Sequence, residues 1–306
     1  MIGYFTAIQA AEVLAELAAA DANVVLLSQD LGAVGSFTAR FPERHFDLGI
    51  TEQNLVGVAA GMASAGMRPF VLAMAPFLSM RSFEQIRTDC GYNRNRVVFL
   101  APFAGLEAGP WGATHHAIED IALLRTVPGL TLLSPADPGE TARAVRAAAA
   151  LDGPVYIRIG GLLPIDGYEA PFRVGEAVRL REGSDLAILA TGPCVATALV
   201  VHEALRRDGI GARVLNVHTI KPLDREAVLA AARDSGRLLT VEEHFVAGGL
   251  GGAVAEVLAE AGVGRLLRVG IGDVFCTEVC PYPELLRVHG LDATGVEQAA
   301  RALLAA

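Results

Sequence analysis

Short apolar runs alternate with helix-length segments along the first half of the chain, and this alternation restricts the possible folds more than any other feature. The runs are NVVLLS (23–28), PFVLAM (69–74), RVVFLA (96–101), LTLLS (130–134) and PVYIRI (154–159). They are apolar on both faces, which is typical of buried parallel strands. Helix candidates lie between them, at residues 6–20, 51–66, 79–90, 116–126 and 138–150. A repeated strand–helix order predicts a mainly parallel α/β sheet covered by helices on both faces.

The alternation stops at a segment rich in glycine and proline and then resumes. GGLLPIDGYEAPF (160–172) has little periodicity and indicates a linker. Further strand candidates lie at 186–191, 212–217, 237–242 and 265–271, and helix candidates at 195–208, 224–234 and 250–261. We therefore predict two doubly wound α/β domains, at residues 1–162 and 176–306, joined by a linker at 163–175. The second domain is the smaller one, and 306 residues suffice for about two domains.

The composition limits the possible environments and partners. Charged residues make up 19% of the chain, hydrophobic residues 52%, and the formal net charge is −9. Arg68, Arg81, glycines and prolines interrupt the apolar stretches, so none predicts a spanning helix of roughly 20 residues. We attribute the apolar excess to a large interface with another subunit. The negative charge argues against nucleic acid, and the N-terminus lacks the basic start of a secretory signal, so we expect a cytoplasmic protein.

The segment EEHFVAGGLGGAV (242–254) follows a strand and opens a helix, where a dinucleotide fingerprint would lie. The G-x-G-x-x-G spacing fails, because the third position after Gly249 and Gly251 is Val254. We favour a tight glycine turn that lets the helix pack closely on the backbone.

Two other polar groups give weak signals. Glu242, Glu243 and His244 end a strand and could form a site, although charged strand ends are commoner at subunit contacts. Cys276 and Cys280 are spaced for one helix face, but no neighbouring His or Cys completes a metal site. Four cysteines in a chain of this length do not indicate a disulfide framework.

A solitary carboxylate heads an apolar helix candidate. Glu52 begins the segment EQNLVGVAAGMASAGM, which has no charged residue between Asn54 and Met67. A surface helix would carry charge along one face, so this helix is predicted to be buried. An isolated buried charge is very costly, so Glu52 requires a partner.

Several polar and aromatic residues fall where strands end. The glycine-rich loop GPWGATHHAIED (109–120) brings His115 and His116 to the carboxyl edge of the sheet, where open α/β sheets bind ligands. A histidine there can move protons near neutral pH. Arg158 ends another strand, either as a structural ion pair or as an anchor for a carboxylate or phosphate. The residues at or near this edge, which together predict one site, are Asp30, Glu52, Phe77, His115 and Arg158.

Three sequence blocks resemble the C-terminal half of transketolases. They are HFDLGITEQNLVGVAAGMASAGMRPF, GPWGATHHAIEDIALLR, and HTIKPLDREAV followed by GRLLTVEEHFVAGGLGGAVAEVL. More specifically, they resemble the separate C-terminal subunit of a split transketolase, and the resemblance extends over about residues 6–300. GITEQN is shared more widely among thiamine-diphosphate enzymes, whereas the other blocks resemble transketolases and deoxyxylulose-phosphate synthases. The histidine block is unlike the β subunits of 2-oxo-acid dehydrogenases.

The resemblance implies thiamine diphosphate as cofactor and a role for each site residue. Glu52 would hydrogen-bond N1′ of the aminopyrimidine, with burial favouring its protonated form, so that the ring can deprotonate C2 of the thiazolium. Phe77 would stack on the pyrimidine, and Arg81 in the same segment is assigned to the cofactor site. Asp30 would lie close to the thiazolium, and His115 would exchange protons with a substrate oxygen.

The G-D-G motif that helps to bind Mg²⁺ in this family has no match. The GD pair at Gly272 and Asp273 is followed by valine. The resemblance therefore implies that an N-terminal, diphosphate-binding partner subunit holds Mg²⁺, in an α2β2 complex that transfers a two-carbon ketol or acyl unit. Three alternatives stay open: a deoxyxylulose-phosphate-synthase-like half, the β subunit of a 2-oxo-acid dehydrogenase or decarboxylase, and a non-catalytic assembly subunit.

Three polar substrate positions of the family are apolar in this chain. Val34 stands for a serine, Phe103 for a histidine and Trp111 for an acidic residue. Arg158 keeps one tail-binding group, able to anchor the carboxylate of a 2-oxo-acid donor, and His116 is a further substrate-binding candidate. Apolar groups leave a polar substrate unpaired, so we expect a less phosphorylated or more apolar substrate. Alignment drift across the short loops is the alternative explanation.

Overall fold

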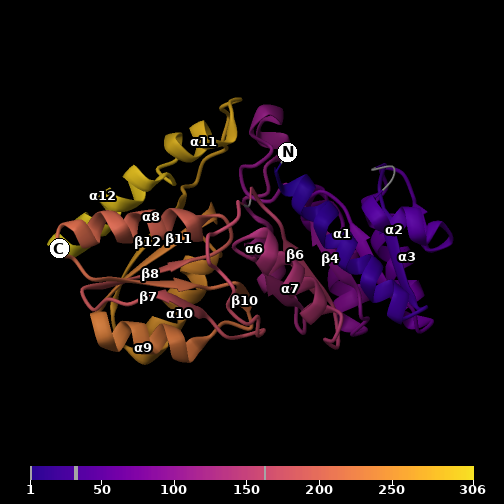
Figure 1. Cartoon of the computed structure of the whole chain (residues 1–306), viewed down its shortest axis with the longest axis horizontal. Coiled ribbons are helices and arrows are strands. Elements are labelled where there is room, and N and C mark those ends of the chain that lie inside the picture. The colour runs from indigo at the N-terminus through magenta and orange to yellow at the C-terminus, as the bar shows by residue number, and fades with distance from the viewer. Residues whose placement is uncertain (1, 31–33, 162) are drawn as a thin grey trace.

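The protein forms two α/β units that lie side by side along its long axis (Figure 1). This computed structural model describes residues 2–30, 34–161 and 163–306. The elements of the first unit are α1 (Ile2–Ala20), β1 (Val24–Ser28), α2 (Gly35–Arg40), β2 (His45–Asp47), α3 (Glu52–Ser64), β3 (Arg68–Leu72), α4 (Ala75–Arg81), α5 (Phe83–Gln85), β4 (Val98–Ala101), α6 (Asp120–Arg125), β5 (Thr131–Leu133), α7 (Pro138–Ala148) and β6 (Val155–Arg158). Short 3-10 turns cover Pro42–Arg44, Gly109–Trp111 and Ala113–His115, and a π-helix covers Ile86–Tyr92.

The second unit repeats the same architecture with fewer strands. Its elements are β7 (Val178–Arg181), β8 (Leu186–Ala190), α8 (Cys194–Arg207), β9 (Ala212–Asn216), β10 (Thr219–Lys221), α9 (Arg225–Ser235), β11 (Arg237–Phe245), α10 (Leu250–Ala261), β12 (Arg265–Ile271), α11 (Tyr282–Val288) and α12 (Ala293–Ala305). Its sheet has the order β12-β11-β8-β9-β7, parallel except for the edge strand β7.

The larger sheet draws on both halves of the chain. Its order is β10-β5-β6-β4-β3-β1-β2, and β10 runs antiparallel to β5. Because β10 follows the linker in sequence, the sheet does not end at residue 162. In Figure 1, β10 lies between the two units.

The apolar runs form strands because both of their faces are covered. Every residue of β1, β4, β6 and β8 is buried, as expected for inner parallel strands. Polar caps fix the starts of α7, α9 and α12: in α7, the carboxylate of Asp137 accepts the Glu140 N–H at 2.6 Å.

Two predicted helices differ from the structure. The helix expected at 79–90 is broken into α4, α5 and the π-helix, and the helix expected at 116–126 begins only at Asp120. In the second case, the preceding residues form a 3-10 turn and an extended segment that carry the histidine loop. The sequence reading also missed α2, β2, β7, β10, α11 and α12, and its missed strands are three or four residues long.

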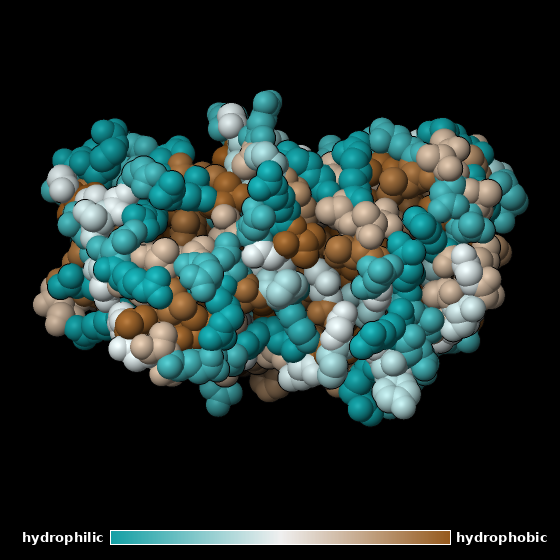
Figure 2. Space-filling model, turned by 90° about the horizontal axis from the view of Figure 1, so that it is seen from below, coloured by the Kyte–Doolittle hydropathy of each residue, from teal (hydrophilic) through white to brown (hydrophobic). Residues whose placement is uncertain are grey.

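The surface carries apolar side chains between polar ones. Figure 2 shows hydrophobic residues gathered near the middle of one face, over the region between the units. The large hydrophobic residues that are exposed include Ile50, Tyr92, Trp111, Phe275 and Val279. Among the described helices, none is long and apolar enough to cross a membrane.

Candidate active site

A row of rings connects four of the predicted site residues. The ring centroids of Phe103 and Trp111 are 5.1 Å apart, those of Trp111 and His115 5.4 Å, and those of His115 and Phe77 5.2 Å. These residues come from the loop after β4, two 3-10 turns and α4. The structure therefore brings side chains from separate segments into one site at the carboxyl edge of the larger sheet.

Arg81 continues this row to the solitary carboxylate. Its guanidinium carbon lies 4.0 Å from the Phe77 ring centroid, a cation–π contact. Its Nη1 also donates to Oε1 of Glu52 at 2.8 Å. Glu52 is 5% exposed at the first position of α3, whereas the Arg81 side chain is 52% exposed. Glu52 thus has its charge partner, and both residues line an open cavity of about 440 Å³.

Two site residues have left-handed backbone conformations. Asp30 follows β1 with φ of 47°, and Phe103 follows β4 with φ of 60°. Such angles are costly for residues other than glycine and gather at functional sites. The Asp47 carboxylate holds the first of these turns, accepting the backbone N–H of Asp30 at 2.9 Å and that of Gly49 at 3.0 Å.

A pocket adjoins the far end of the ring row. It has a volume of about 250 Å³ and is lined by Phe103, Glu107, Ala108, Pro110 and Trp111. Among the described residues, its lining carries the carboxylate of the buried Glu107 and no cationic side chain. Sequence reasoning missed Glu107, although a charged residue in a glycine-rich loop beside Phe103 was a usable signal.

His115 and His116 point to different surroundings. His115 is half-buried, and its Nδ1 lies 2.9 Å from Oγ1 of Thr114. His116 is 3% exposed, outside the ring row, and neither ring nitrogen has a hydrogen-bond partner. Burial, followed by the neighbouring His289, lowers the pKa of His116. His116 therefore lies apart from the connected rings, and its role in substrate binding stays a prediction.

Val34 and Arg158 also require correction. Val34 is 2% exposed and packs in a core cluster with Leu26 and Phe37, so it does not face the pocket. Arg158 is 2% exposed, and its Nε donates to Oδ2 of Asp120 at 2.9 Å. Its Nη2 donates to the carbonyls of Ala117 at 3.0 Å and Glu243 at 2.7 Å. Of the two alternatives, the structure shows the structural ion pair, and this guanidinium is not available to anchor a substrate.

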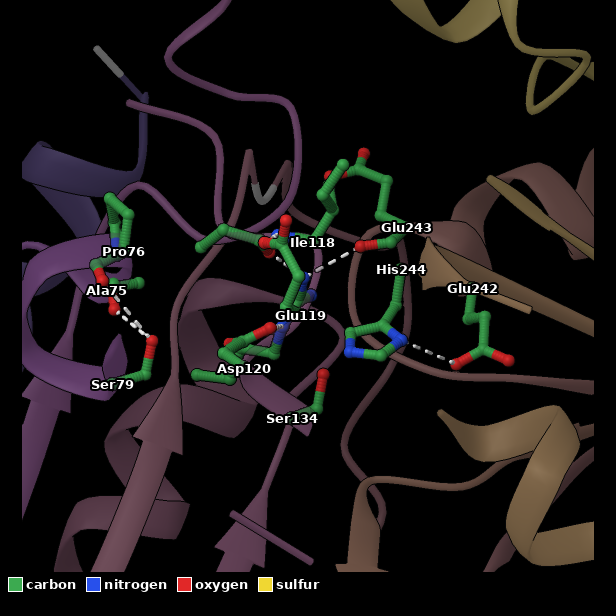
Figure 3. A network of polar contacts seen from close by, with 12 residues as sticks. Ala75, Pro76, Ser79, Ile118, Glu119, Asp120, Ser134, Glu242, Glu243 and His244 are labelled. Atoms are coloured by element: carbon green, nitrogen blue, oxygen red, sulfur yellow. Dashed lines mark hydrogen bonds and ion pairs between the residues drawn. The ribbon is translucent and has the colours of Figure 1, made fainter. Parts of the chain in front are cut away.

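The end of β11 completes the buried polar network (Figure 3). Glu242 accepts the backbone N–H groups of Leu250 at 2.6 Å and Gly251 at 2.7 Å, which caps α10. A Cβ on Gly249 would lie 2.0 Å from the Glu242 carboxylate, so the glycine turn allows this close approach. Burial raises the pKa of Glu242 to about 7.

His244 and Glu243 turn from the same strand toward the first unit. Nε2 of His244 accepts the backbone N–H of Ala122 at 3.2 Å, and burial lowers the pKa of His244 to about 4. Burial raises the pKa of Glu243, opposed chiefly by its hydrogen bond from Tyr282. These residues meet at a contact within the chain rather than at a subunit contact, which corrects the commoner reading of charged strand ends.

No group of three His, Cys, Asp or Glu side chains in residues 2–30, 34–161 and 163–306 could hold a metal ion. Cys276 is buried and Cys280 partly so, and both are free thiols.

Comparisons with known proteins agree with this architecture. The family described as "Transketolase, pyrimidine binding domain" matches residues 4–161, and "Transketolase, C-terminal domain" matches residues 175–296. The 6-deoxy-6-sulfo-D-fructose transketolase subunit SqwH of Clostridium sp. (strain MSTE9) is 41% identical over 294 residues, 94% of this chain and 91% of that one. The 1-deoxy-D-xylulose-5-phosphate synthase 1 of Geobacter sulfurreducens is 38% identical over 304 residues, 96% of this chain but 47% of that one.

A solved structure has the same fold over the whole chain. A split-gene transketolase, described as an inactive beta4 tetramer, superimposes with a TM-score of 0.91 at 40% identity and covers 98% of both chains. The fold is therefore that of the pyrimidine-binding and C-terminal domains of a thiamine-diphosphate enzyme class. The chain belongs to the transketolase family, which confirms the predicted resemblance and the predicted pair of α/β domains.

Proposed function

We propose that this chain is the catalytic C-terminal subunit of a thiamine-diphosphate-dependent transketolase-like transferase. In this proposal it transfers a two-carbon ketol or acyl unit to an acceptor with little or no phosphate. We keep the domain bounds expected from the sequence, residues 1–162 and 176–306 with the linker at 163–175, and add that β10 of the second segment completes the first sheet.

The contact of Arg81 with Glu52 and Phe77 is the observation that carries the proposal. A guanidinium is flat and bears N–H donors, and here it lies over Phe77 at 4.0 Å while donating to Glu52 at 2.8 Å. An aminopyrimidine is also flat and can carry a proton on a ring nitrogen. The spacing of the carboxylate and the aromatic ring therefore suits such a ring, and the half-exposed Arg81 side chain is free to move aside.

Each residue of the row has a role in this proposal. When bound, thiamine diphosphate supplies the carbon nucleophile and electron sink of the reaction. Glu52 would hold and pass a proton at the pyrimidine N1′, Phe77 would stack on that ring, Arg81 would move aside and stay at the edge of the cofactor site, and Asp30 would place negative charge near the thiazolium. His115 gives a proton to, or takes one from, the substrate oxygen.

We assign the diphosphate and Mg²⁺ to an N-terminal partner subunit, in a cytoplasmic α2β2 complex. The relative described as a split-gene transketolase supports a two-gene arrangement. Ile50, 67% exposed, lies two residues from Glu52 and lines the same cavity. Apolar exposure beside a half-built site is expected where a second polypeptide completes it.

The substrate preference rests on the pocket beside Phe103 and Trp111. Among the described residues, this lining offers a phosphate no cationic side chain and, apart from the Trp111 indole N–H, no side-chain donor; an ionised Glu107 would disfavour a second anion. The buried ion pair of Arg158 removes the cation expected from the sequence. A neutral polyol end or an apolar end of an acceptor fits this lining better than a phosphate ester.

The test is a specificity comparison on the reconstituted complex. The chain is co-expressed with candidate diphosphate-binding subunits from the same genome, and kcat/KM is measured for pairs of acceptor aldoses that differ only by a terminal phosphate. Hydroxypyruvate and pyruvate serve as ketol and acyl donors. We expect at least about 10-fold preference for the unphosphorylated acceptor, and a larger preference in Trp111→Asp, which adds a second carboxylate to the same pocket.

Two results would contradict the proposal in different ways. A complex that binds no thiamine diphosphate would overturn the assigned chemistry. A complex that favours phosphorylated acceptors would leave the chemistry standing and overturn the substrate class.

A further inference from the structure

We propose that Glu243 of the second unit is a positioning residue for the loop that carries Phe103, Trp111 and His115. This loop, residues 102–119, is named the substrate loop below. The inference rests on the proposed function, because it assigns a task to a residue that does not itself touch substrate or cofactor. It gives the second unit a direct part in arranging the site.

The Glu243 carboxylate binds the N-terminal part of the substrate loop, near Leu106. Its Oε2 accepts the backbone N–H of Leu106 at 3.2 Å, and its Oε1 accepts the hydroxyl of Tyr282 from α11. Gly105 has φ of +68°, and a Cβ there would lie 1.9 Å from Oε2. The loop backbone therefore rests directly on a carboxylate that is 1% exposed.

Arg158 links the C-terminal part of the substrate loop to Glu243. The Glu243 carbonyl accepts from Nη2 of Arg158, which also donates to the carbonyl of Ala117. Gly105 and Ala117 exchange two backbone hydrogen bonds of 3.0 Å, forming an isolated antiparallel bridge. A further contact lies beside these: the backbone N–H of Phe245, two residues after Glu243, donates to the carbonyl of Ile118, which follows Ala117, at 2.9 Å.

These anchors lie close to the functional rings along the chain. Phe103 lies two residues before Gly105 and His115 two residues before Ala117, so the bridge closes the segment that carries His115 directly beside Phe103 in the chain. A loop whose two ends are both fixed can hold its side chains within the small range of positions and angles that proton transfer requires. Without the carboxylate, the Leu106 N–H and the Tyr282 hydroxyl would be buried without an acceptor.

A purely structural role for Glu243 is the competing explanation, and the chain supplies a matched control. Glu242 is the preceding residue of the same strand, is equally buried, and also accepts hydrogen bonds. Its partners, however, are at the start of α10 and none belongs to the substrate loop. Truncation of either Glu242 or Glu243 should lower stability, whereas only truncation of Glu243 should misplace the substrate loop.

The experiment compares Glu243→Ala, Glu243→Gln, Tyr282→Phe and Glu242→Ala. In the reconstituted complex, kcat/KM for the acceptor, cofactor affinity and deuterium exchange at the cofactor C2 are measured. In the full chain, amide hydrogen exchange at Leu106 is followed. We expect Glu243→Ala and Tyr282→Phe to lower acceptor kcat/KM about 10-fold or more and to speed amide exchange at Leu106. Cofactor affinity and C2 exchange stay unchanged, Glu243→Gln recovers most of the loss, and Glu242→Ala lowers Tm alone.

The proposal is overturned if Glu243→Ala and Tyr282→Phe lower only Tm, with acceptor kcat/KM and Leu106 exchange as in Glu242→Ala. Tyr282→Phe keeps the test decisive if Glu243→Ala does not fold. Failure of the proposed function has a different signature, because the wild-type complex would then bind no cofactor, while faster Leu106 exchange in Tyr282→Phe would still support the loop contact.

Discussion

Glu52 combines burial with a hydrogen-bond partner that can leave. Its carboxylate is fixed by the first turn of α3, while the Arg81 side chain that pairs with it is half exposed to solvent. A salt bridge with one exposed partner contributes little to stability. The pair is therefore expected to add little to the stability of the fold, which leaves Glu52 available for the role proposed above.

Replacing Glu52 with glutamine tests its role at the residue scale. The amide keeps the size and a hydrogen-bonding oxygen but cannot accept and return a proton. We expect the rate of deuterium exchange at the cofactor C2, followed by NMR on the reconstituted complex, to fall about 100-fold or more. Assembly measured by light scattering stays unchanged. The exposed pair of Glu84 with Arg87 supplies the control Glu84→Gln, and equal exchange rates in the two variants would refute the role.

The sequence predicted which residues gather at the sheet edge better than it predicted where each side chain points. Glu52, Phe77, Arg81, Phe103, Trp111 and His115 do form one connected set. The sequence left Arg158 open between a structural ion pair and an anchor, because its partner Asp120 lies 38 residues earlier in the chain. The burial of His116 and Val34 could not be predicted, because a local sequence pattern does not determine loop geometry.

Strand β11 is the element on which the contact between the units depends. It is buried along its inner residues and ends in carboxylate, carboxylate and imidazole groups that each bind a different segment. The imidazole of His244 must stay neutral at Nε2 to accept from Ala122. Protonation would remove this acceptor, so acid should weaken the junction.

The pH dependence of stability tests the role of His244. Burial, partly opposed by Asp120, lowers its pKa from 6.5 to about 4 in the folded chain. The unfolded chain then binds the proton first as pH falls. The stability contribution is fully present above about pH 6.5 and is lost as pH falls toward 4, by up to about 3 kcal/mol.

His244→Gln removes the titrating group and keeps an acceptor for Ala122. Urea unfolding between pH 7 and 4 should give a flatter stability profile for this variant than for the wild type. Glu242, whose Oε2 lies 4.0 Å from Nδ1 of His244, is present in both proteins. Parallel profiles would show that His244 does not control the acid response.

At the element scale, long buried strands were predictable and irregular helices were not. Inner strands such as β4 and β8 stand out because both faces are apolar. Strand β7 alternates partly buried and exposed residues over four positions, and β10 has three residues, too few for a periodic signal. The break of the 79–90 helix into a π-helix depends on tertiary packing, which overrides local propensity.

The linker joins the two units more firmly than its composition suggested. Within the predicted linker 163–175, Tyr168 is 9% exposed, and its hydroxyl donates to Oε1 of Glu140 in α7. Asn216 of β9 donates to the same hydroxyl at 2.8 Å and to the Glu140 carboxylate at 3.0 Å. One buried network thus includes both units and the segment between them.

Removing the Tyr168 hydroxyl tests this network on the whole molecule. Tyr168→Phe keeps the ring but leaves Asn216 and Glu140 short of a partner, so we expect a loss of about 1–3 kcal/mol in the free energy of unfolding. Urea denaturation of the full chain measures it. Tyr92→Phe, at a ring that is 87% exposed, is the control and should change little. Equal midpoints for the two variants would mean that the linker only spans a distance.

The antiparallel strand β10 has a consequence for how such a protein can be divided. A chain cut after the first unit would keep β5 but lose β10, and the unpaired N–H and C=O groups of β5 could then pair with a strand of another molecule. We therefore expect both units to be encoded in one gene and expressed as one chain.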